Sequence, residues 1–532
     1  MLKHLLSILI FVPILAALLA LFFPKDNKRL FFFYAIGVSV FQLAVLVLVF
    51  IQYQNETTSL KLVEQLTWFE LIFSSGNGLR AEYFLALDGL NLPLVSLSVV
   101  IMFFATVSSY TISEKVKGYF ILLLILNGAI IGSFVAFDLL LFYLFFEFML
   151  LPMFFLIGIW GGPKREYASI KFFLYTLLGS ILILIVFIGL YISATVPGQE
   201  NIMHTFNLIH LMDNNSYVYQ SILNPASELT IGSMNIRTWA FLFLFVGFAI
   251  KLPMVPFHTW LPDAHVEAPT PISVILAALL LKIGGYGLTR IAYPVFPDAA
   301  TSLSWFVGLM GVISILYGAL NAMASKDLKR LIAYSSVSHM GFVLLGLASV
   351  TLEGVSGSIY QMVSHGLISA MLFLIAGVLY DRTHDRMIDN YSGLISKMPA
   401  YFVVVLIAFF ASLGLPGFSG FIAEIMVFLG AFKSNGVNGL LHESLAIVAT
   451  LGLALGAAYY LWTLQRMFFG KFNIKSGSAE MLFDLDGREK FMLIPLAAAV
   501  LVAGIFPQLL VRYINPYAQE FVDLILTSAR IN

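Results

Sequence analysis

The sequence predicts an all-α integral membrane protein with about 14 transmembrane helices. Three observations lead to this fold class. The 532 residues are 60% hydrophobic and only 11% charged, whereas soluble domains carry about 25% charged residues. Long apolar runs recur along the chain, and a bilayer core about 30 Å thick requires roughly 20 residues of helix. Proline and glycine interrupt two of these runs near their middle.

The predicted spans follow one another along most of the chain. They cover roughly residues 2–23, 30–52, 90–112, 118–137, 138–159, 167–194, 237–258, 269–291, 303–324, 327–350, 357–380, 401–432, 443–469 and 489–512. The first span resembles a secretory signal because Lys3 precedes it. However, Pro24 and Lys25 stand where a small-residue cleavage site should lie. We therefore expect this span to be retained.

The charge and cysteine content exclude several classes of function. The 29 basic and 29 acidic residues give a formal net charge of +0, so the chain shows no sign of a nucleic-acid partner. The sequence contains no cysteine, which excludes disulfides and thiolate-bound iron–sulfur clusters within this chain. Any electron carriers are therefore expected on other chains.

Basic residues cluster on alternate connections between the predicted spans. The clusters lie at residues 25–29, 115–117, 164–165, 326–330, 382–386 and 471–475. In contrast, residues 331–380 contain no lysine or arginine. The positive-inside rule places the basic connections in the cytoplasm and both termini on the other side of the membrane, which agrees with an even number of spans.

The two interrupted spans occupy matching places in the chain. The seventh span contains Pro253 and Pro256, and the twelfth contains Pro416 between two glycines. Spans 4–8 and 9–13 form two sets of five, so the second set is expected to be inverted relative to the first. This arrangement is typical of transporters whose working sites lie at the breaks. The alternative is that the prolines merely kink ordinary helices.

The inverted-repeat interpretation divides the chain into four parts. The predicted divisions are residues 1–116 for the first three spans, 117–300 for the first five-helix repeat, 301–475 for the second, inverted repeat and 476–532 for the C-terminal span.

Three charged residues of the first repeat fall inside predicted spans. Glu147 lies about nine residues into its span, Lys251 directly precedes the first break, and Lys282 lies about 13 residues into the next span. Each charge near the bilayer centre costs at least about 2.5 kcal/mol, so such groups are usually paired, hydrated or functional. Because a nearby carboxylate favours a charged amine, movement of Glu147 could make Lys251 hold or release a proton. The alternatives are a protonated, hydrogen-bonded Glu147 or a static buried ion pair.

The second repeat contains a further series of titratable side chains. His339 lies about 12 residues into the tenth span and His365 about eight into the eleventh, while Glu424 follows the second break. Histidine titrates near neutral pH, which suits proton transfer. His365 could instead serve only as a hydrogen-bonding partner between helices. We expect Glu424 to be the terminal proton exit.

The segment after the first break contains polar residues that could suggest a metal site. These residues are His258, Asp263, His265 and Glu267. However, Pro262 and Pro269 break the local helix, and no partners that would orient the ligands can be named. A cytoplasmic funnel or a capping cluster fits the segment better, and we include His258 among the candidate proton-transfer residues.

Three motifs together resemble a known family. They are the span around Glu147, residues 248–265 and residues 333–341. They look like the antiporter-like subunits of proton-pumping NADH-quinone oxidoreductase, respiratory complex I, and most like subunit M, called subunit 4 in mitochondria. The resemblance covers nearly the whole chain. It implies 14 helices in two inverted five-helix repeats, and pumping residues at Glu147, Lys251, Lys282, His339 and Glu424.

The resemblance also implies partners and a location. Subunits L and N carry lysine in the second broken helix, so Glu424 resembles subunit M at this position. The implied enzyme is NADH:quinone oxidoreductase, with no cofactor in this chain and with NADH, FMN, iron–sulfur clusters and quinone on other subunits. The expected neighbours are the L-type and N-type antiporter-like subunits, within the lipid bilayer of a bacterial inner membrane.

The resemblance implies a relay in which protons pass from the cytoplasm toward Lys251 and Lys282, then past His339 to Glu424. Three alternatives remain open. A subunit of a multi-subunit cation/proton antiporter shares this fold and most of these residues, and a chloroplast-type homologue has a similar pattern. A passive scaffold would not explain why charged residues are kept within the hydrocarbon.

Overall fold

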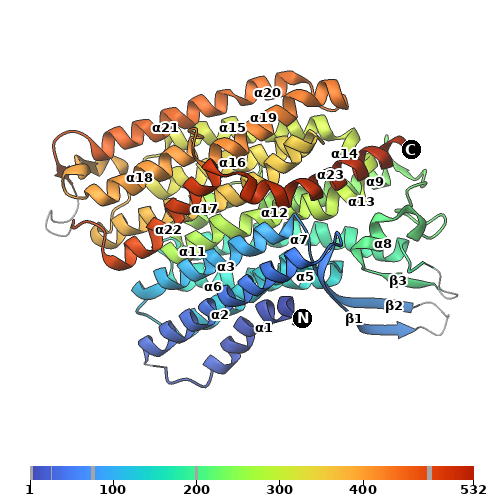
Figure 1. Ribbon diagram of the computed structural model, residues 1–532, viewed down its shortest axis with the longest axis horizontal. Helices are drawn as coiled ribbons and strands as arrows, with labels where there is room; N and C mark the ends of the chain where they lie inside the picture. Colours follow the sequence, from blue (N-terminus) through green and yellow to red (C-terminus); the bar gives the residue numbers. More distant parts are fainter. Residues whose placement is uncertain (1–3, 26, 73–77, 198–201, 476–481, 532) are drawn as a thin grey trace.

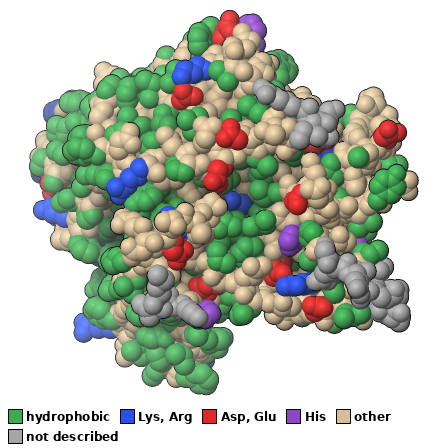
Figure 2. All heavy atoms as spheres, turned by 45° about the vertical axis from the view of Figure 1, so that its right-hand side comes forward, with side chains coloured by type: hydrophobic (Ala, Val, Ile, Leu, Met, Phe, Trp, Pro, Cys, Tyr) green, Lys and Arg blue, Asp and Glu red, His purple; other side chains and the backbone are tan. Residues whose placement is uncertain are grey.

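Long apolar helices lie side by side through the molecule, with a small sheet at one end of the bundle (Figure 1). The computed structural model describes residues 4–25, 27–72, 78–197, 202–475 and 482–531. Within these ranges, 11 helices are long and apolar enough to cross a membrane, or up to 12 if one bent pair is a single span. Hydrophobic side chains are also exposed over much of the surface seen in Figure 2. These features confirm an all-α membrane protein.

The predicted count of about 14 spans is close but is not confirmed. Helix α1 (Leu5–Ala20) and helix α9 (Ile236–Lys251) occupy two predicted spans but have only 16 residues each, fewer than the roughly 20 that a bilayer requires. The predicted starts of the first span, at residue 2, and of the C-terminal division, at residue 476, lie outside the described residues.

The remaining helices follow the predicted order. The N-terminal part continues with α2 (Lys28–Asn55) and α3 (Asn91–Ser108). The first set of helices also contains α4 (Val116–Val135), α5 (Leu139–Phe148), α6 (Leu150–Trp160), α7 (Arg165–Ser193), α10 (Trp260–Glu267), α11 (Thr270–Ile275), α12 (Leu281–Gly287) and α13 (Tyr293–Val295). The second set consists of α15 (Ser304–Ala324), α16 (Leu328–Ala348), α17 (Leu352–Thr383), α18 (Pro399–Ser412), α19 (Ser419–Val437), α20 (Glu443–Ala449) and α21 (Leu451–Phe468).

Both predicted breaks are present, between α9 and α10 and between α18 and α19. Helix α9, the first half of one broken helix, lies toward the end of the bundle that carries the sheet, whereas α18 lies toward the opposite end (Figure 1). The two broken helices therefore run in opposite directions through the bundle, as expected for inverted repeats.

Side chains and glycines stabilise the two breaks. The indole Nε1 of Trp260 donates to the carbonyl of Ile250 at 2.9 Å, which satisfies a carbonyl at the end of α9 that has no partner within the helix. The backbone N–H of Val255 donates to Ser314 Oγ at 3.1 Å. In the second break, Gly414 and Gly417 have φ values of 73° and 96°, a region that other residues rarely adopt.

The sequence pattern does not predict the sheet. Strand β1 (Lys61–Ile72) pairs antiparallel with β2 (Gly78–Leu87), and β2 pairs parallel with the short β3 (Met203–Thr205). Residues on β1 are mostly exposed toward its C-terminal end. Because exposed strands lack a simple alternation of apolar and polar residues, a search for apolar runs misses them.

The last predicted span, residues 489–512, is not one straight helix, because it bends after Ile505. Helix α22 (Gly487–Ile505) ends before Phe506 and Pro507, and the chain bends by 63° into α23 (Gln508–Ile531). Pro507 cannot donate a backbone hydrogen bond, which explains a helix boundary at this point. Residues 506–512 were expected to continue the span because they are largely apolar.

Buried ion pairs connect helices near the ends of the bundle. The guanidinium of Arg382 on α17 donates to both carboxylate oxygens of Glu489 on α22, at 2.9 and 2.8 Å. Both side chains are buried, with 3% and 6% exposure. A buried charge of this kind depends on its partner, because removal of one member leaves the other without compensation.

We expect Glu489→Gln to destabilise the chain by about 3–5 kcal/mol, because the buried Arg382 loses its counter-charge. The thermal unfolding temperature of the assembled complex measures this effect. Glu353→Gln is the matched control, since the Glu353–Lys433 pair is exposed at 31% and 45% and such pairs contribute little. Equal unfolding temperatures for the two variants would contradict the assigned role of the buried pair.

Candidate functional site

Buried ionisable side chains form a series through the middle of the bundle, which we call the polar axis. Its members are Glu147, Lys251, Lys282, His365, His339 and Glu424. Apart from the half-buried Glu147, each is at most 7% exposed. The axis runs from α5 through the first break and α12 to α17, α16 and α19, so it connects the two sets of helices.

Lys282 lies between two π-helical segments, η3 (Leu276–Leu280) and η4 (Leu288–Ala292). Its Nζ donates to the carbonyl of Ala277 within η3 at 2.5 Å and lies 2.7 Å from Nδ1 of His365. π-Helical turns shift backbone carbonyls away from the regular ladder and often occur at functional sites. A proton can therefore be shared directly between the amine of Lys282 and the imidazole of His365.

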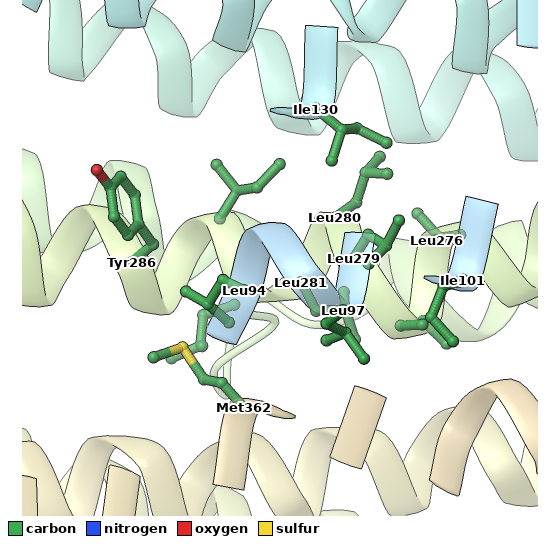
Figure 3. Packing of buried hydrophobic residues seen from close by; sticks show 14 of the residues in the cluster. Leu94, Leu97, Ile101, Ile130, Leu276, Leu279, Leu280, Leu281, Tyr286 and Met362 are labelled. Atoms are coloured by element: carbon green, nitrogen blue, oxygen red, sulfur yellow. The ribbon is translucent and has the colours of Figure 1, made fainter. Parts of the chain in front are cut away.

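Apolar side chains cover the helix on the other sides of this contact. Figure 3 shows Leu279, Leu280 and Leu281 surrounded by residues from three neighbouring helices. These neighbours include Leu94 and Leu97 of α3, Ile130 of α4 and Met362 of α17. All are at most 4% exposed. Among the described residues, this packing leaves His365 and the Ala277 carbonyl as the hydrogen-bonding partners of Lys282.

His365 lies next to His339, and the centroids of the two imidazole rings are 5.4 Å apart. Nδ1 of His339 lies 3.7 Å from Oε1 of Glu424 and 3.3 Å from Nε2 of Gln361. These two partners require opposite states, because Nδ1 can accept from the amide only without a proton and can donate to the carboxylate only with one. The position therefore suits a group that alternates between two protonation states.

Glu424 fits against the second break. A Cβ atom added to Gly414 would lie 2.0 Å from Oε2 of Glu424, so only glycine leaves room for the carboxyl group. On the other side of the imidazole, Nε2 of His339 contacts Ser412 Oγ at 3.1 Å. The hydroxyl of Ser412 lies 2.6 Å from the hydroxyl of Tyr460. The Tyr460 hydroxyl in turn donates to Ser335 Oγ at 3.1 Å.

The hydroxyl groups and Gln361 were missed by reasoning from the sequence. Each is neutral and carries a small polar group within an apolar span, so it resembles an ordinary residue of helix packing. The available signal was their spacing, since Ser335 precedes His339 by four residues and therefore lies on the same helix face.

Glu147 and Lys251 lie near each other but do not form an ion pair within 4.0 Å. Lys251 Nζ donates to the carbonyl of Phe146 at 3.3 Å and lies 3.2 Å from the centre of that ring. The Glu147 carboxylate is close enough to interact electrostatically with Lys251, and its Oε1 is buried with no hydrogen-bond partner among the described residues. This arrangement differs from the static pair that the sequence left open.

Lys251 and Lys282 belong to helices in contact, but in the described part of the chain no hydrogen bond joins the two side chains. A Cβ atom added to Gly284 would lie 2.6 Å from the backbone N of Leu252 and from the carbonyl oxygen of Phe248. Helix α12 therefore packs directly on the end of α9, beside the first break. From Lys282 to Glu424 the members of the polar axis are close neighbours, although no hydrogen bond joins His365 to His339 among the described residues, and a wider gap separates the two lysines.

Among the described residues, neither histidine after the first break forms a hydrogen bond with the polar axis, although His265 lies close enough to Lys282 and His365 to interact with them electrostatically. His258 is 3% exposed and its ring meets Tyr317 edge-on, with centroids 5.1 Å apart. His265 on α10 is fully buried and stacks on Phe373 with centroids 4.3 Å apart. Neither ring nitrogen of His265 has a hydrogen-bond partner among the described residues. Within the same residues, no group of three or more His, Asp or Glu side chains could hold a metal ion.

Comparison with known proteins places this arrangement in a family. Residues 136–450 match the profile of the membrane family described as "NADH:quinone oxidoreductase/Mrp antiporter, TM". NADH-quinone oxidoreductase subunit M of Rhodobacter capsulatus is 39% identical over 525 residues, which cover 98% of this chain and 97% of that protein. The chain belongs to the subunit M family. This result confirms the resemblance seen in the sequence.

Solved structures agree with this assignment to the subunit M family. A chain of respiratory complex I from Thermus thermophilus with bound NADH has a TM-score of 0.80 at 30% identity, and the match covers 98% of this chain and 99% of that chain. A chain of the Mrp complex from Dietzia sp. DQ12-45-1b also gives a TM-score of 0.80, but at 21% identity. The second match shows the common fold alone.

In this subunit M family member, Asp484 holds the start of the second broken helix. Its carboxylate accepts from the backbone N–H groups of Ala400 and Tyr401 at 2.8 and 2.9 Å, at the N-terminus of α18. Burial acts to raise the pKa of Asp484, but hydrogen bonds from Ala400, Tyr401 and Leu485 and the charge of Lys490 outweigh burial and leave the pKa below its usual value.

We expect Asp484→Asn to lower stability at neutral pH by about 0.5–2 kcal/mol, the usual effect of losing a helix cap. Because the folded-state pKa is lowered, the stabilising effect is fully present above the unfolded-state pKa of about 3.9. It is lost as the pH falls from that value through the lower pKa of the folded state. Thermal unfolding of the complex between neutral and acidic pH measures the difference.

Asp389→Asn is the control, because Asp389 forms an exposed ion pair with Arg466 and such pairs contribute little. The difference between wild type and Asp484→Asn should shrink as the pH falls. A difference that stays constant or grows on acidification would refute the assigned charge-dependent cap.

Proposed function

We propose that this chain carries protons across the membrane as the M-type subunit of an NADH-quinone oxidoreductase, driven by quinone reduction on other subunits. The observation that supports this function most strongly is the series of contacts from Lys282 through His365 and His339 to Glu424. Buried ionisable groups in a membrane are costly, and a connected series of them is typical of a proton relay.

In this proposal, protons enter from the end of the bundle that carries the basic connections. Helix α10 lies at that end, since the backbone N–H of Lys164 donates to a carboxylate oxygen of Glu267 at 2.8 Å. Its residue His265 and the nearby Lys329, which donates to the Ala268 carbonyl at 2.8 Å, are positioned to receive protons. Helix α19 continues from the second break toward the opposite end, so Glu424 is the proposed exit.

Glu147 supplies the control step. The carboxylate of Glu147 and Lys251 interact electrostatically without a direct ion pair. A movement of the carboxylate toward the amine would form the ion pair, and the reverse movement would remove it. A close carboxylate favours the charged amine, and its withdrawal in a buried site favours release of the proton. A neighbouring subunit that changes this pairing would drive the release of a proton from Lys251 toward Lys282.

The assembly and orientation follow from the same proposal. The L-type and N-type antiporter-like subunits would flank this chain in a bacterial inner membrane, with both termini on the non-cytoplasmic side. The functional divisions would be residues 1–116, 117–300, 301–475 and 476–532. NADH, FMN, iron–sulfur clusters and quinone would be bound by other subunits.

The alternative is a subunit of a multi-subunit cation/proton antiporter, because the description of the matching family includes the Mrp antiporter and a chain of the Mrp complex shares this fold. That likeness has 21% identity, whereas the match to complex I has 30% and the match to the Rhodobacter subunit has 39%. Proton movement that requires NADH oxidation distinguishes the proposed enzyme from an antiporter, which would respond to a sodium gradient without NADH.

Gly414→Ala tests the proposed exit. The new Cβ atom would occupy the place of the Glu424 carboxyl group and move it away from His339. We expect NADH-driven proton uptake by vesicles to fall by about tenfold or more, because a displacement of about 1 Å in a reacting group can reduce a rate about 100-fold. Glu424→Gln should produce a similar loss with almost no change in shape.

Gly417→Ala is the matched control in the same break, since Gly417 also has a positive φ, of 96°, and a Cβ atom there would meet no atom within 4 Å. Assembly of each variant into the complex is checked by the yield of intact enzyme. Full proton uptake in assembled Gly414→Ala and Glu424→Gln enzymes would exclude an exit at Glu424.

A further inference from the structure

Two cavities of different chemistry meet beside α23. The larger has a volume of about 620 Å³ and lies between the end of α2, the start of β1 and α23. The smaller, of about 300 Å³, is a crevice between α2, α3, α17, α22 and α23. Tyr513 lines both cavities. The two spaces therefore adjoin at the bend between α22 and α23.

The larger cavity carries both positive and negative side chains. Its charged lining residues are Lys61, Arg512, Asp88 and Glu520. Asp88 is already neutralised by the ion pair with the buried Arg290, at 2.5 Å. The remaining charges are the two cations and the carboxylate of Glu520. Lys61 lies 4.3 Å from the centre of the Tyr53 ring and Arg512 lies 4.7 Å from that of Tyr513, and these two rings are 5.9 Å apart.

Both cations keep donors for a ligand. Lys61 Nζ donates to the carbonyl of Tyr53 at 3.0 Å, and Arg512 Nη2 donates to the hydroxyl of Tyr513 at 2.9 Å. A lysine has three N–H donors and an arginine has five, so these two hydrogen bonds leave most of the donors available. Two such cations suit a phosphate group.

The smaller cavity is almost entirely apolar and opens on the surface of the bundle. Phe50, Val100, Val502 and Leu509 are among its lining residues, and Val502 and Leu509 are 44% and 46% exposed. Val502 lies on α22 and Leu509 on α23, and in a membrane protein an opening rimmed by exposed apolar side chains faces hydrocarbon rather than water. The crevice therefore suits an acyl chain.

The inner end of the crevice lies close to the polar axis. Leu97 and Leu367 line it, and Leu97 packs so tightly on Gly366 that an added Cβ atom would lie 2.4 Å from it. Gly366 follows His365 directly in the chain. One layer of side chains thus separates the crevice from the contact between Lys282 and His365.

We propose that the two cavities form one binding site for a phospholipid with an ethanolamine headgroup. Its phosphate binds Lys61 and Arg512, its ammonium group binds Glu520, and one acyl chain fills the crevice. A polypeptide segment would fit less well, because the site requires a phosphate-sized group directly above a narrow apolar channel.

Photolabelling of the assembled complex tests this site. The probes are phosphatidylethanolamine and phosphatidylglycerol, each with a photoreactive group on one acyl chain, in lipid nanodiscs of phosphatidylcholine. We expect the ethanolamine probe to label crevice residues on α3 and α22. In Ala499→Phe the added ring fills the crevice, so labelling there should fall by about fivefold or more.

Ala498→Phe is the matched control, because Ala498 is exposed and does not line the crevice. A variant with both Lys61→Gln and Arg512→Gln should lose labelling without any change in the crevice, whereas Lys433→Gln should retain it. These variants change surface side chains, so the test does not depend on whether Ala499→Phe folds.

Three results would overturn the proposal. Equal labelling of the Ala499→Phe and Ala498→Phe enzymes would exclude the acyl chain from the crevice. Equal labelling by the glycerol and ethanolamine probes would exclude recognition of the ammonium group. Side chains of a neighbouring subunit filling the crevice in the assembled complex would replace the lipid with a protein contact.

Discussion

The contact between Lys282 and His365 is the constraint on which the rest of the structure depends. It places an amine and an imidazole 2.7 Å apart in a fully buried position, where an unpartnered charge would be very costly. The protein compensates through the Ala277 carbonyl in a π-helical turn and through the imidazole of His365 itself. Removing any of these partners would leave a polar group without compensation, so the helices on both sides must hold their positions closely.

The two broken helices likewise provide partners or space for buried polar groups of the polar axis. A continuous helix uses its carbonyl and N–H groups internally, whereas each break frees some of them within the membrane. At the first break, Trp260 satisfies one such carbonyl, and Lys251 lies at the end of α9. At the second, Gly414 makes space for Glu424. The breaks thus combine charge placement with freedom to move, and the inverted repeats provide one break for each half of the path.

The sequence predicts the breaks and the charged members of the axis because proline, glycine and buried charges are rare inside spans and each has a direct physical effect. It does not predict the π-helical turns around Lys282, since these depend on packing rather than on residue type. It also misses Ser412 and Tyr460, whose hydroxyl groups gain a role only when two helices bring them together. The bend after Ile505 was missed because apolar residues continue through it, and the roles of the axis residues stay a prediction.

The most direct measurement is a high-resolution density map of the complete complex during turnover with NADH and quinone. We expect ordered water to bridge the gap between Lys251 and Lys282 and to connect Glu424 with the end of the bundle that carries the sheet. We also expect the contacts of His339 with Gln361 and with Glu424 to alternate between states. If these side chains are isolated from water and from one another in every state, proton transfer along the axis is contradicted.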